Sequence, residues 1–275
     1  MDYVELTLEI ADDEQAEILT AELADFPFES FERQDSRLKA YVPQPLLADC
    51  KKEVDALLER YGIRRATYVS IESQDWNAVW ESSFEPVEVD GRLTIRAPFH
   101  APSATPVEVI VMPRMSFGTG HHATTCLMAA GLLDCDVAGR RGLDMGSGTG
   151  VLAILAAKLG ADSVDAVDID RQAYENGIDN IRANGVEGRV VPLLGDAAAI
   201  AGRHYDFVLA NINRNTLLAQ LPIYADVLGT GGRLSMSGML EADAPTIADA
   251  ARDAGFAVIA TALRDGWARV DAVKR

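Results

Sequence analysis

From Arg141 to the end of the chain, short apolar runs alternate with helical patterns, and this alternation constrains the fold more than any other feature. Strands are predicted at 142–145, 163–168, 190–194, 207–212 and 233–237, and helices at about 151–160, 171–184, 214–228 and 241–254. Regular alternation of this kind is typical of a parallel, doubly wound α/β sheet that carries helices on both faces.

The sheet is predicted to end in a hairpin. Two further strands, 258–263 and 268–273, are separated only by Arg264-Asp265-Gly266-Trp267. Four residues are too few for a crossover helix, so the seventh strand must run antiparallel to its neighbour. An open seven-stranded sheet with this ending is the variant found in class I methyltransferases rather than in dehydrogenases.

A glycine-rich loop joins the first of these strands to the first helix. The loop is Gly146-Ser147-Gly148-Thr149-Gly150, and Val151 opens the helix. Glycine lets the backbone turn tightly and approach a ligand at a helix N-terminus. The dinucleotide fingerprint GxGxxG needs its third glycine at position 151, which is valine here. The observed GxGxG therefore favours S-adenosylmethionine over a nicotinamide cofactor, with Gly146 and Gly148 at the ligand.

Acidic residues follow the next two strands. Asp168 ends the strand 163–168, where a carboxylate can accept both hydroxyls of a cofactor ribose. Asp170 is the competing residue, but its position favours the cap of the helix that begins near Arg171. Asp196 follows the strand 190–194, where it is placed either to bind the adenine amino group or to cap the loop.

The first 72 residues predict a separate domain. Val4, Leu6, Leu8 and Ile10 alternate with polar residues, as in a half-buried strand. The order that follows is helix, strand, strand, helix, strand, which is the ferredoxin-like βαββαβ pattern. In this order Asp12 and Asp13 start the first helix, Asp35-Ser36 marks a hairpin and Pro45 opens the second helix. The N-terminal domain is thus predicted to be a small ferredoxin-like α+β unit.

Residues 73–85 are predicted to be a linker, and 86–275 the second domain. Trp76, Trp80 and Phe84 recur every four residues in the linker, which indicates successive helical turns. Residues 86–111 read as a β-rich entry segment with a hairpin turn at Asp90-Gly91.

The formal net charge of −17 bears on the partner. Binding to a nucleic-acid backbone would have to work against an adverse long-range field, so we expect no direct nucleic-acid partner. Residues 1–72 hold 17 acidic and 8 basic side chains. An acidic domain suits a basic protein partner, although solubility alone also accounts for the charge.

Several other classes of protein do not fit the sequence. No apolar run approaches the ~18 residues of a membrane span, and the first residues lack the basic region of a signal peptide, so we expect a cytoplasmic protein without membrane contact. Cys50, Cys126 and Cys135 form no metal-binding or disulfide pattern. His121 and His122 are adjacent but lack further ligands at zinc spacing, so we expect no metal.

Over almost its whole length the chain resembles the ribosomal protein L11 methyltransferase family. Four motifs carry the resemblance: Trp76-Asn77-Ala78-Val79-Trp80, Phe117-Gly118-Thr119-Gly120-His121-His122-Ala123-Thr124-Thr125, the glycine loop with Val167-Asp168-Ile169-Asp170, and Ala210-Asn211-Ile212-Asn213. The second motif is the most specific. Where the family usually has proline after the second histidine, this chain has Ala123, a departure that affects loop stiffness and not chemistry.

The resemblance implies a protein lysine methyltransferase that uses S-adenosylmethionine. Its substrate would be the basic ribosomal protein L11, and the N-terminal domain would hold that substrate. The acceptors would be amino groups of L11, namely lysine side chains, with the N-terminal amine as a further candidate. By position, Thr125, Gly146, Asp168 and Asn211 would contact the cofactor, Phe117 would belong to a loop over it, and Asn211 would serve catalysis. Asn213 either orients the amine or caps the helix that begins at Arg214. We expect the enzyme to act as a monomer.

Two alternatives share these sequence features. A methyltransferase for another protein or a small molecule would carry the same cofactor domain, because that domain does not encode the substrate. A non-catalytic protein that binds the cofactor is the alternative from another class.

Overall fold

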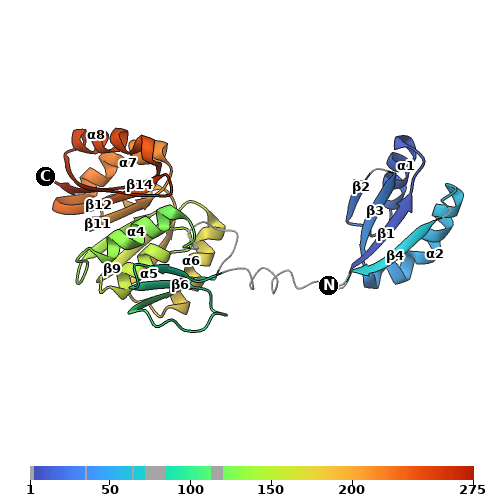
Figure 1. The fold of residues 1–275 in the computed structure, drawn as a ribbon, viewed down its shortest axis with the longest axis horizontal. Coiled ribbons are helices and arrows are strands. Elements are labelled where there is room, and N and C mark those ends of the chain that lie inside the picture. Colours follow the sequence, from blue (N-terminus) through green and yellow to red (C-terminus); the bar gives the residue numbers. More distant parts are fainter. Residues whose placement is uncertain (1–2, 35, 64, 72–84, 113–119) are drawn as a thin grey trace. The chain divides into compact units, whose positions relative to one another are not determined.

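The computed structural model describes residues 3–34, 36–63, 65–71, 85–112 and 120–275. The chain divides into two compact units, Met1–Ser83 and Phe84–Arg275 (Figure 1). The predicted turn residue Asp35, the linker aromatics and Phe117 lie outside the described residues.

The N-terminal unit is a four-stranded antiparallel sheet with two helices. Its elements are β1 (Tyr3–Glu9), α1 (Asp13–Leu23), β2 (Ser30–Gln34), β3 (Arg37–Pro43), α2 (Gln44–Arg60) and β4 (Ala66–Ile71). The strand order is β2-β3-β1-β4, and every neighbouring pair is antiparallel. The ferredoxin-like prediction is confirmed.

Three of the local signals read in the first 72 residues, the alternation in the first strand and the starts of both helices, are present in the structure. Val4, Leu6 and Leu8 alternate in β1 and are buried. Asp12 caps α1, because its carboxylate accepts a hydrogen bond of 2.9 Å from the Gln15 backbone N–H. Pro45 lies in the first turn of α2, where its missing N–H costs nothing.

The second unit holds the large sheet. Its elements are β5 (Val87–Val89), β6 (Leu93–Arg96), β7 (Val107–Ile110), α4 (Ala123–Leu133), β8 (Arg141–Met145), α5 (Val151–Lys158), β9 (Ser163–Asp168), α6 (Arg171–Ala183), β10 (Val190–Leu194), η1 (Ala197–Ile200), β11 (Tyr205–Asn211), α7 (Arg214–Val227), β12 (Leu228–Leu240), η2 (Glu241–Asp243), α8 (Ala244–Asp253), β13 (Phe256–Arg264) and β14 (Trp267–Lys274).

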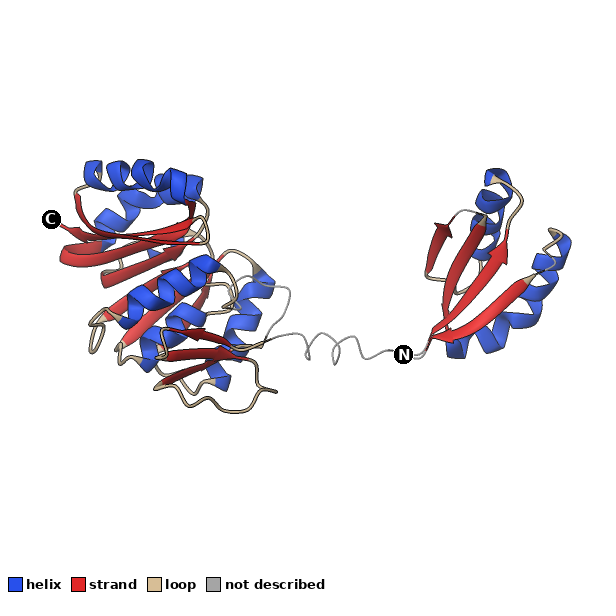
Figure 2. Ribbon diagram, viewed as in Figure 1, coloured by secondary structure: helices blue, strands red, loops and turns tan. Residues whose placement is uncertain are grey.

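Seven strands form this sheet in the order β10-β9-β8-β11-β12-β14-β13. The first five are parallel to one another, and β14 runs antiparallel to both of its neighbours, as predicted. Helices α4, α5 and α6 cover one face and α7 and α8 the other (Figure 2). Each face has its own apolar core, and the sheet lies between the two cores.

Helix α4 was not among the predicted elements. All of its apolar residues from Cys126 to Ala129 are buried, so the helix lacks a polar face. A helix that is apolar on every side shows no 3.6-residue periodicity, and the pattern by which helices are recognised is absent.

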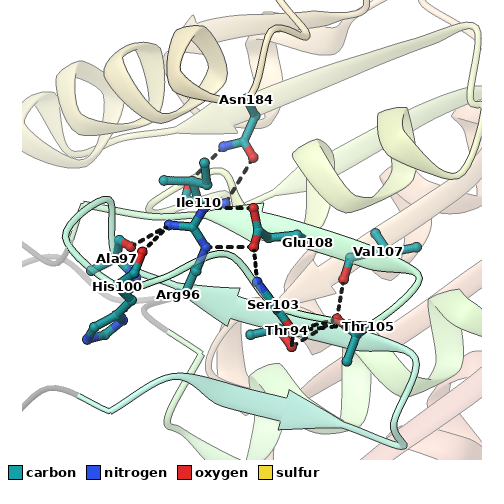
Figure 3. A network of polar contacts seen from close by, with 10 residues as sticks. All are labelled: Thr94, Arg96, Ala97, His100, Ser103, Thr105, Val107, Glu108, Ile110 and Asn184. Atoms are coloured by element: carbon teal, nitrogen blue, oxygen red, sulfur yellow. Dashed lines mark hydrogen bonds and ion pairs between the residues drawn. The ribbon is translucent and has the colours of Figure 1, made fainter.

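A small three-stranded sheet, in the order β5-β6-β7, packs beside α4 and α5. Its first hairpin turns at Asp90-Gly91, both in the left-handed region with φ of 52° and 64°, which confirms the predicted turn. Arg96 donates to both carboxylate oxygens of Glu108, at 2.6 and 2.8 Å, and joins β6 to β7 (Figure 3).

Within the described residues, none of the helices is long and apolar enough to cross a membrane.

Candidate active site

A pocket of about 530 Å³ opens at the carboxyl ends of the parallel strands. The chain reverses its direction of progress across the sheet between β8 and β11, and ligands of open α/β sheets bind at such a point. The lining residues come from the ends of β8, β9, β11 and β12, from the starts of α4, α6 and β14, and from the loops between them: His122, Thr124, Gly146, Gly148, Asp168, Ile169, Asp170, Gln172, Ala173, Asn211, Ile212, Asn213, Gly238 and Trp267.

The glycine loop forms the floor of the pocket. Gly146, Gly148 and Gly150 have φ of 71°, 54° and 78°, a region that other residues rarely adopt. The backbone N–H groups of Gly146 and Ser147 both donate to the Val167 carbonyl, so β9 fixes the start of the loop. Helix α5 begins directly after it at Val151, as predicted.

Asp168 lies beside this loop at the end of β9. One carboxylate oxygen accepts the Gly148 N–H at 2.8 Å and the other accepts the Asp170 N–H at 2.9 Å. A carboxylate offers about four acceptor positions, so two remain for a ligand. Asp170 caps α6 by accepting the Ala173 N–H at 2.9 Å, as predicted.

A second carboxyl group, Asp144 in β8, is buried under the loop. Its Oδ2 accepts the Ala153 N–H at 3.0 Å, and its Oδ1 has no hydrogen-bond partner among the described residues. Burial, together with the nearby charge of Asp168, raises the pKa of Asp144 to about 7. This carboxyl group therefore titrates near neutral pH.

Asn211 lines the pocket at the end of β11. The residue is 9% exposed, and its side-chain oxygen is buried without a hydrogen-bond partner among the described residues. Such an atom has an unmet capacity to accept hydrogens. Asn213 caps α7 through the Thr216 N–H at 3.0 Å, so the capping alternative is present in the structure, although Asn213 also lines the pocket.

Of the other predicted residues that the structure describes, Thr125 and Asp196 are not among the lining residues of the pocket. Thr125 is fully buried in the first turn of α4, and its hydroxyl has no partner in the described part of the chain. Asp196 caps the short helix Ala197–Ile200 by accepting the Ala198 N–H at 2.9 Å. Phe117 is outside the described residues. The structure thus brings together Gly146, Gly148, Asp168 and Asn211.

His122 and Trp267 form an aromatic side of the pocket that sequence reasoning did not find. Their rings meet edge to face, with centroids 4.6 Å apart. Nδ1 of His122 accepts the Thr124 N–H at 3.3 Å and so caps α4. Trp267 reaches the site because β14 is antiparallel, which places its first residue at the edge where the parallel strands end. The predicted antiparallel direction of the last strand was the sequence signal that could have indicated Trp267 as a pocket residue.

Among the described residues, no three His, Cys, Asp or Glu side chains are grouped so that they could hold a metal ion. The polar groups of the pocket suit an organic ligand better. Asp168 offers acceptors for a pair of hydroxyls, and Ile169, which is 77% exposed, offers an apolar surface for a flat ring. A Cβ at Gly146 or Gly238 would collide with Ile212, so glycine at both positions leaves room for Ile212 in the pocket lining. These features fit a nucleoside cofactor such as S-adenosylmethionine.

The chain is similar to one family of known proteins over almost its whole length. The family model described as "Ribosomal protein L11 methyltransferase (PrmA)" matches residues 6–275. The chain is 43% identical to the ribosomal protein L11 methyltransferase of Porphyromonas gingivalis, over 96% of this chain and 91% of the relative. It is 36% identical to that of Phocaeicola vulgatus, over 98% of both chains. The crystal structure of the ribosomal protein L11 methylase from Lactobacillus delbrueckii subsp. bulgaricus superposes with a TM-score of 0.63 at 25% identity, covering 70% of this chain and all of the other.

Proposed function

Because the chain belongs to the ribosomal protein L11 methyltransferase family, we propose that it transfers methyl groups from S-adenosylmethionine to amino groups of ribosomal protein L11. The proposed acceptors are lysine side chains of L11, with its N-terminal amine as a further candidate. The observation that carries the proposal is the pocket itself. It holds the Asp168 carboxylate, the glycine loop and the Asn211 oxygen, which has no hydrogen-bond partner among the described residues, at the carboxyl ends of the strands.

Four residues of the pocket are proposed to hold the cofactor. Asp168 accepts the two ribose hydroxyls, since both of its oxygens keep acceptor capacity. Gly146 and Gly148 allow the ligand to approach the backbone, and Asn211 lies next to the reacting groups. Thr125, Asp196 and Phe117 remain proposed cofactor residues on the strength of the family resemblance.

Methyl transfer needs an amine with a free lone pair. A lysine ammonium with a pKa near 10.4 is neutral only about once in 10³ at pH 7.4, a deficit of roughly 4 kcal/mol. When bound, S-adenosylmethionine supplies the methyl group and a sulfonium charge that lowers the pKa of a nearby amine. The repulsion between the sulfonium and an ammonium is up to about 4 kcal/mol at ~4 Å and an effective dielectric constant of ~20.

Asn211 suits such an amine because it orients the nitrogen without adding charge. Its buried oxygen can accept an amine hydrogen, whereas a carboxylate at the same place would stabilise the ammonium. The uncharged segment Ala210–Asn213 is consistent with an amine that stays neutral. Orientation of the amine and the methyl group then supplies the rest of the rate acceleration, since in-line displacement needs no covalent enzyme intermediate.

The two units are proposed to divide the work. Residues 86–275 form the methyltransferase domain, 73–85 the linker and 1–72 the substrate-recognition domain. The excess of acidic side chains in residues 1–72 supports recognition of a basic protein.

The test is incubation of the full-length protein with methyl-labelled S-adenosylmethionine and ribosomal proteins that have not been methylated. We expect label in L11, and we expect the Asp168→Ala variant to bind the cofactor about 10- to 150-fold more weakly, or roughly 1.5–3 kcal/mol. Label in another protein or in small amines would instead identify a methyltransferase of different specificity. Cofactor binding without any transfer would identify a non-catalytic binding protein.

A further inference from the structure

Three asparagines at four-residue spacing hydrogen-bond to the backbone of the neighbouring segment 110–112, two of them in helix α6 and the third, Asn184, at its C-cap. Asn184 accepts the Ile110 N–H at 2.9 Å and donates to the Ile110 carbonyl at 2.6 Å (Figure 3). Asn180 accepts the Met112 N–H at 2.9 Å, and Asn176 donates to the Met112 carbonyl at 3.5 Å. The four residues from Asn180 to Asn184 rise about 6 Å along a helix. The two residues from Ile110 to Met112 span about 6.6 Å in extended backbone, so the two spacings match.

Asn180 differs from Asn184 because it also reaches the glycine loop. Its Nδ2 donates to the Thr149 carbonyl at 2.9 Å, and the side chain is buried, with 1% exposure. The orientation of the amide is fixed, because the Met112 N–H can only donate and must therefore face Oδ1. The N–H side of the amide is thus held toward Thr149.

The same face of α6 lies directly against the loop. A Cβ built on Gly177 would lie 3.5 Å from the Gly148 carbonyl oxygen, so the helix backbone and the loop are in contact. Thr149 lies between Gly148 and Gly150, both in the left-handed region, where a peptide group has little steric restraint of its own. The peptide between Thr149 and Gly150 has one hydrogen bond inside the loop, from the Gly150 N–H to the Ser147 carbonyl at 2.8 Å, and a second from outside it, from Asn180 to the Thr149 carbonyl.

We propose that Asn180 is a positioning residue of the methyl-transfer site, and that its amide holds the Thr149 peptide so that the glycine loop keeps the shape that receives the cofactor. This inference rests on the proposed function. Asp168 holds Gly148 from the β9 side, and Asn180 holds Thr149 from the α6 side. A ligand site gains affinity when its backbone is fixed before the ligand arrives.

The test compares Asn180→Asp with Asn184→Asp in the full-length protein. Both changes keep an acceptor for the backbone N–H of the segment 110–112 and remove the amide donor, but only Asn180 donates to the glycine loop. We expect Asn180→Asp to raise the calorimetric Kd for S-adenosylmethionine and S-adenosylhomocysteine by tenfold or more. We expect Asn184→Asp to leave both Kd values within twofold of the parent.

Kinetics distinguish loop positioning from general loss of structure. In Asn180→Asp, KM for S-adenosylmethionine should rise while kcat at saturating cofactor and KM for the acceptor protein hold. Lowering the pH should restore cofactor affinity in part, because a protonated carboxyl can donate to the Thr149 carbonyl again.

Three results would overturn the inference: an unchanged Kd in the Asn180→Asp variant, an equal rise in both variants, or a failure of both Asn180→Asp and Asn180→Ala to fold, which would make the side chain a requirement of the fold. If Asn180→Asp alone fails to fold, Asn180→Ala gives the same comparison without a buried charge. A parent protein that binds no S-adenosylmethionine would contradict the proposed function instead, so the two failures are distinguishable.

Discussion

At the scale of single residues, the buried carboxyl group of Asp144 makes stability depend on pH. Its pKa is raised to about 7 by burial and by Asp168, whereas in the unfolded chain it titrates near 4. Between these values the folded protein binds the proton and the unfolded chain does not, so this group makes the protein less stable as pH rises from about 4 to about 7.

Asp144→Asn should remove that dependence, because an amide cannot ionise. Urea unfolding of the variant and the parent should show the variant gaining stability relative to the parent between pH 5 and pH 8. At ~1.4 kcal/mol per pKa unit the gain is on the order of a few kcal/mol. Other titrating groups cancel in the comparison of the two proteins at each pH. A difference that stays constant with pH would show that Asp144 is ionised in the folded protein throughout.

Asn211→Asp tests the neutral-amine argument, since it changes few atoms and adds a negative charge where the amine must react. That charge should stabilise the ammonium and shift the pH–rate profile for L11 methylation to higher pH, while cofactor affinity holds or tightens. Asn213→Asp is the matched control, because it adds the same charge at an exposed position of the pocket and preserves the cap of α7. An equal loss of rate at every pH would assign Asn211 to positioning alone.

At the scale of elements, the ion pair between Arg96 and Glu108 joins β6 to β7 in the small sheet. Arg96 is 7% exposed as a side chain, and its hydrogen bonds lower the pKa of Glu108. Glu108→Gln should reduce the free energy of unfolding by about 2–3 kcal/mol at pH 7, below the ~3–5 kcal/mol of a fully buried pair because Glu108 is partly exposed.

The pH dependence of this loss identifies its cause. A lowered pKa means that the pair stabilises the protein above the ordinary glutamate pKa and loses that effect as pH falls through the folded value. The difference between parent and Glu108→Gln in urea unfolding should therefore shrink below about pH 4. Glu88→Gln, the same change at an exposed position of β5, should be nearly neutral. A loss that does not vary with pH would mean that packing and not charge is responsible.

The elements also show which parts of the fold and of the site can be predicted from the sequence. Strands β9 and β10 have the predicted bounds, because their apolar runs end at the turn and acidic residues that follow them. Helix α4 was missed because it is apolar on all sides, and with it the cap at His122. Gly146, Asp168 and Asn211 were found from motifs, whereas Trp267 joins them only through the pairing of β14 with β12, a contact between distant parts of the chain.

At the scale of the whole molecule, the two compact units predict separable activities. The unit Phe84–Arg275 contains the pocket and both cores of the large sheet, so a fragment of residues 86–275 should fold and bind S-adenosylmethionine with the affinity of the full chain. It should lose methylation of L11, because the acidic unit proposed to recognise the substrate is missing. Calorimetry and a methylation assay on the fragment and the full-length protein measure the two properties. Methylation of L11 by the fragment at the full-length rate would contradict the recognition role of residues 1–72.

The pocket is proposed to be the site at which methyl groups are transferred to amino nitrogens of L11. The most direct measurement is intact and peptide mass spectrometry of purified, unmethylated L11 after incubation with the protein and S-adenosylmethionine. We predict mass increases of whole methyl groups that map to lysine side chains or to the N-terminal amine and that disappear when S-adenosylmethionine is left out. An L11 of unchanged mass, in the presence of a protein shown by calorimetry to bind the cofactor, would contradict the account.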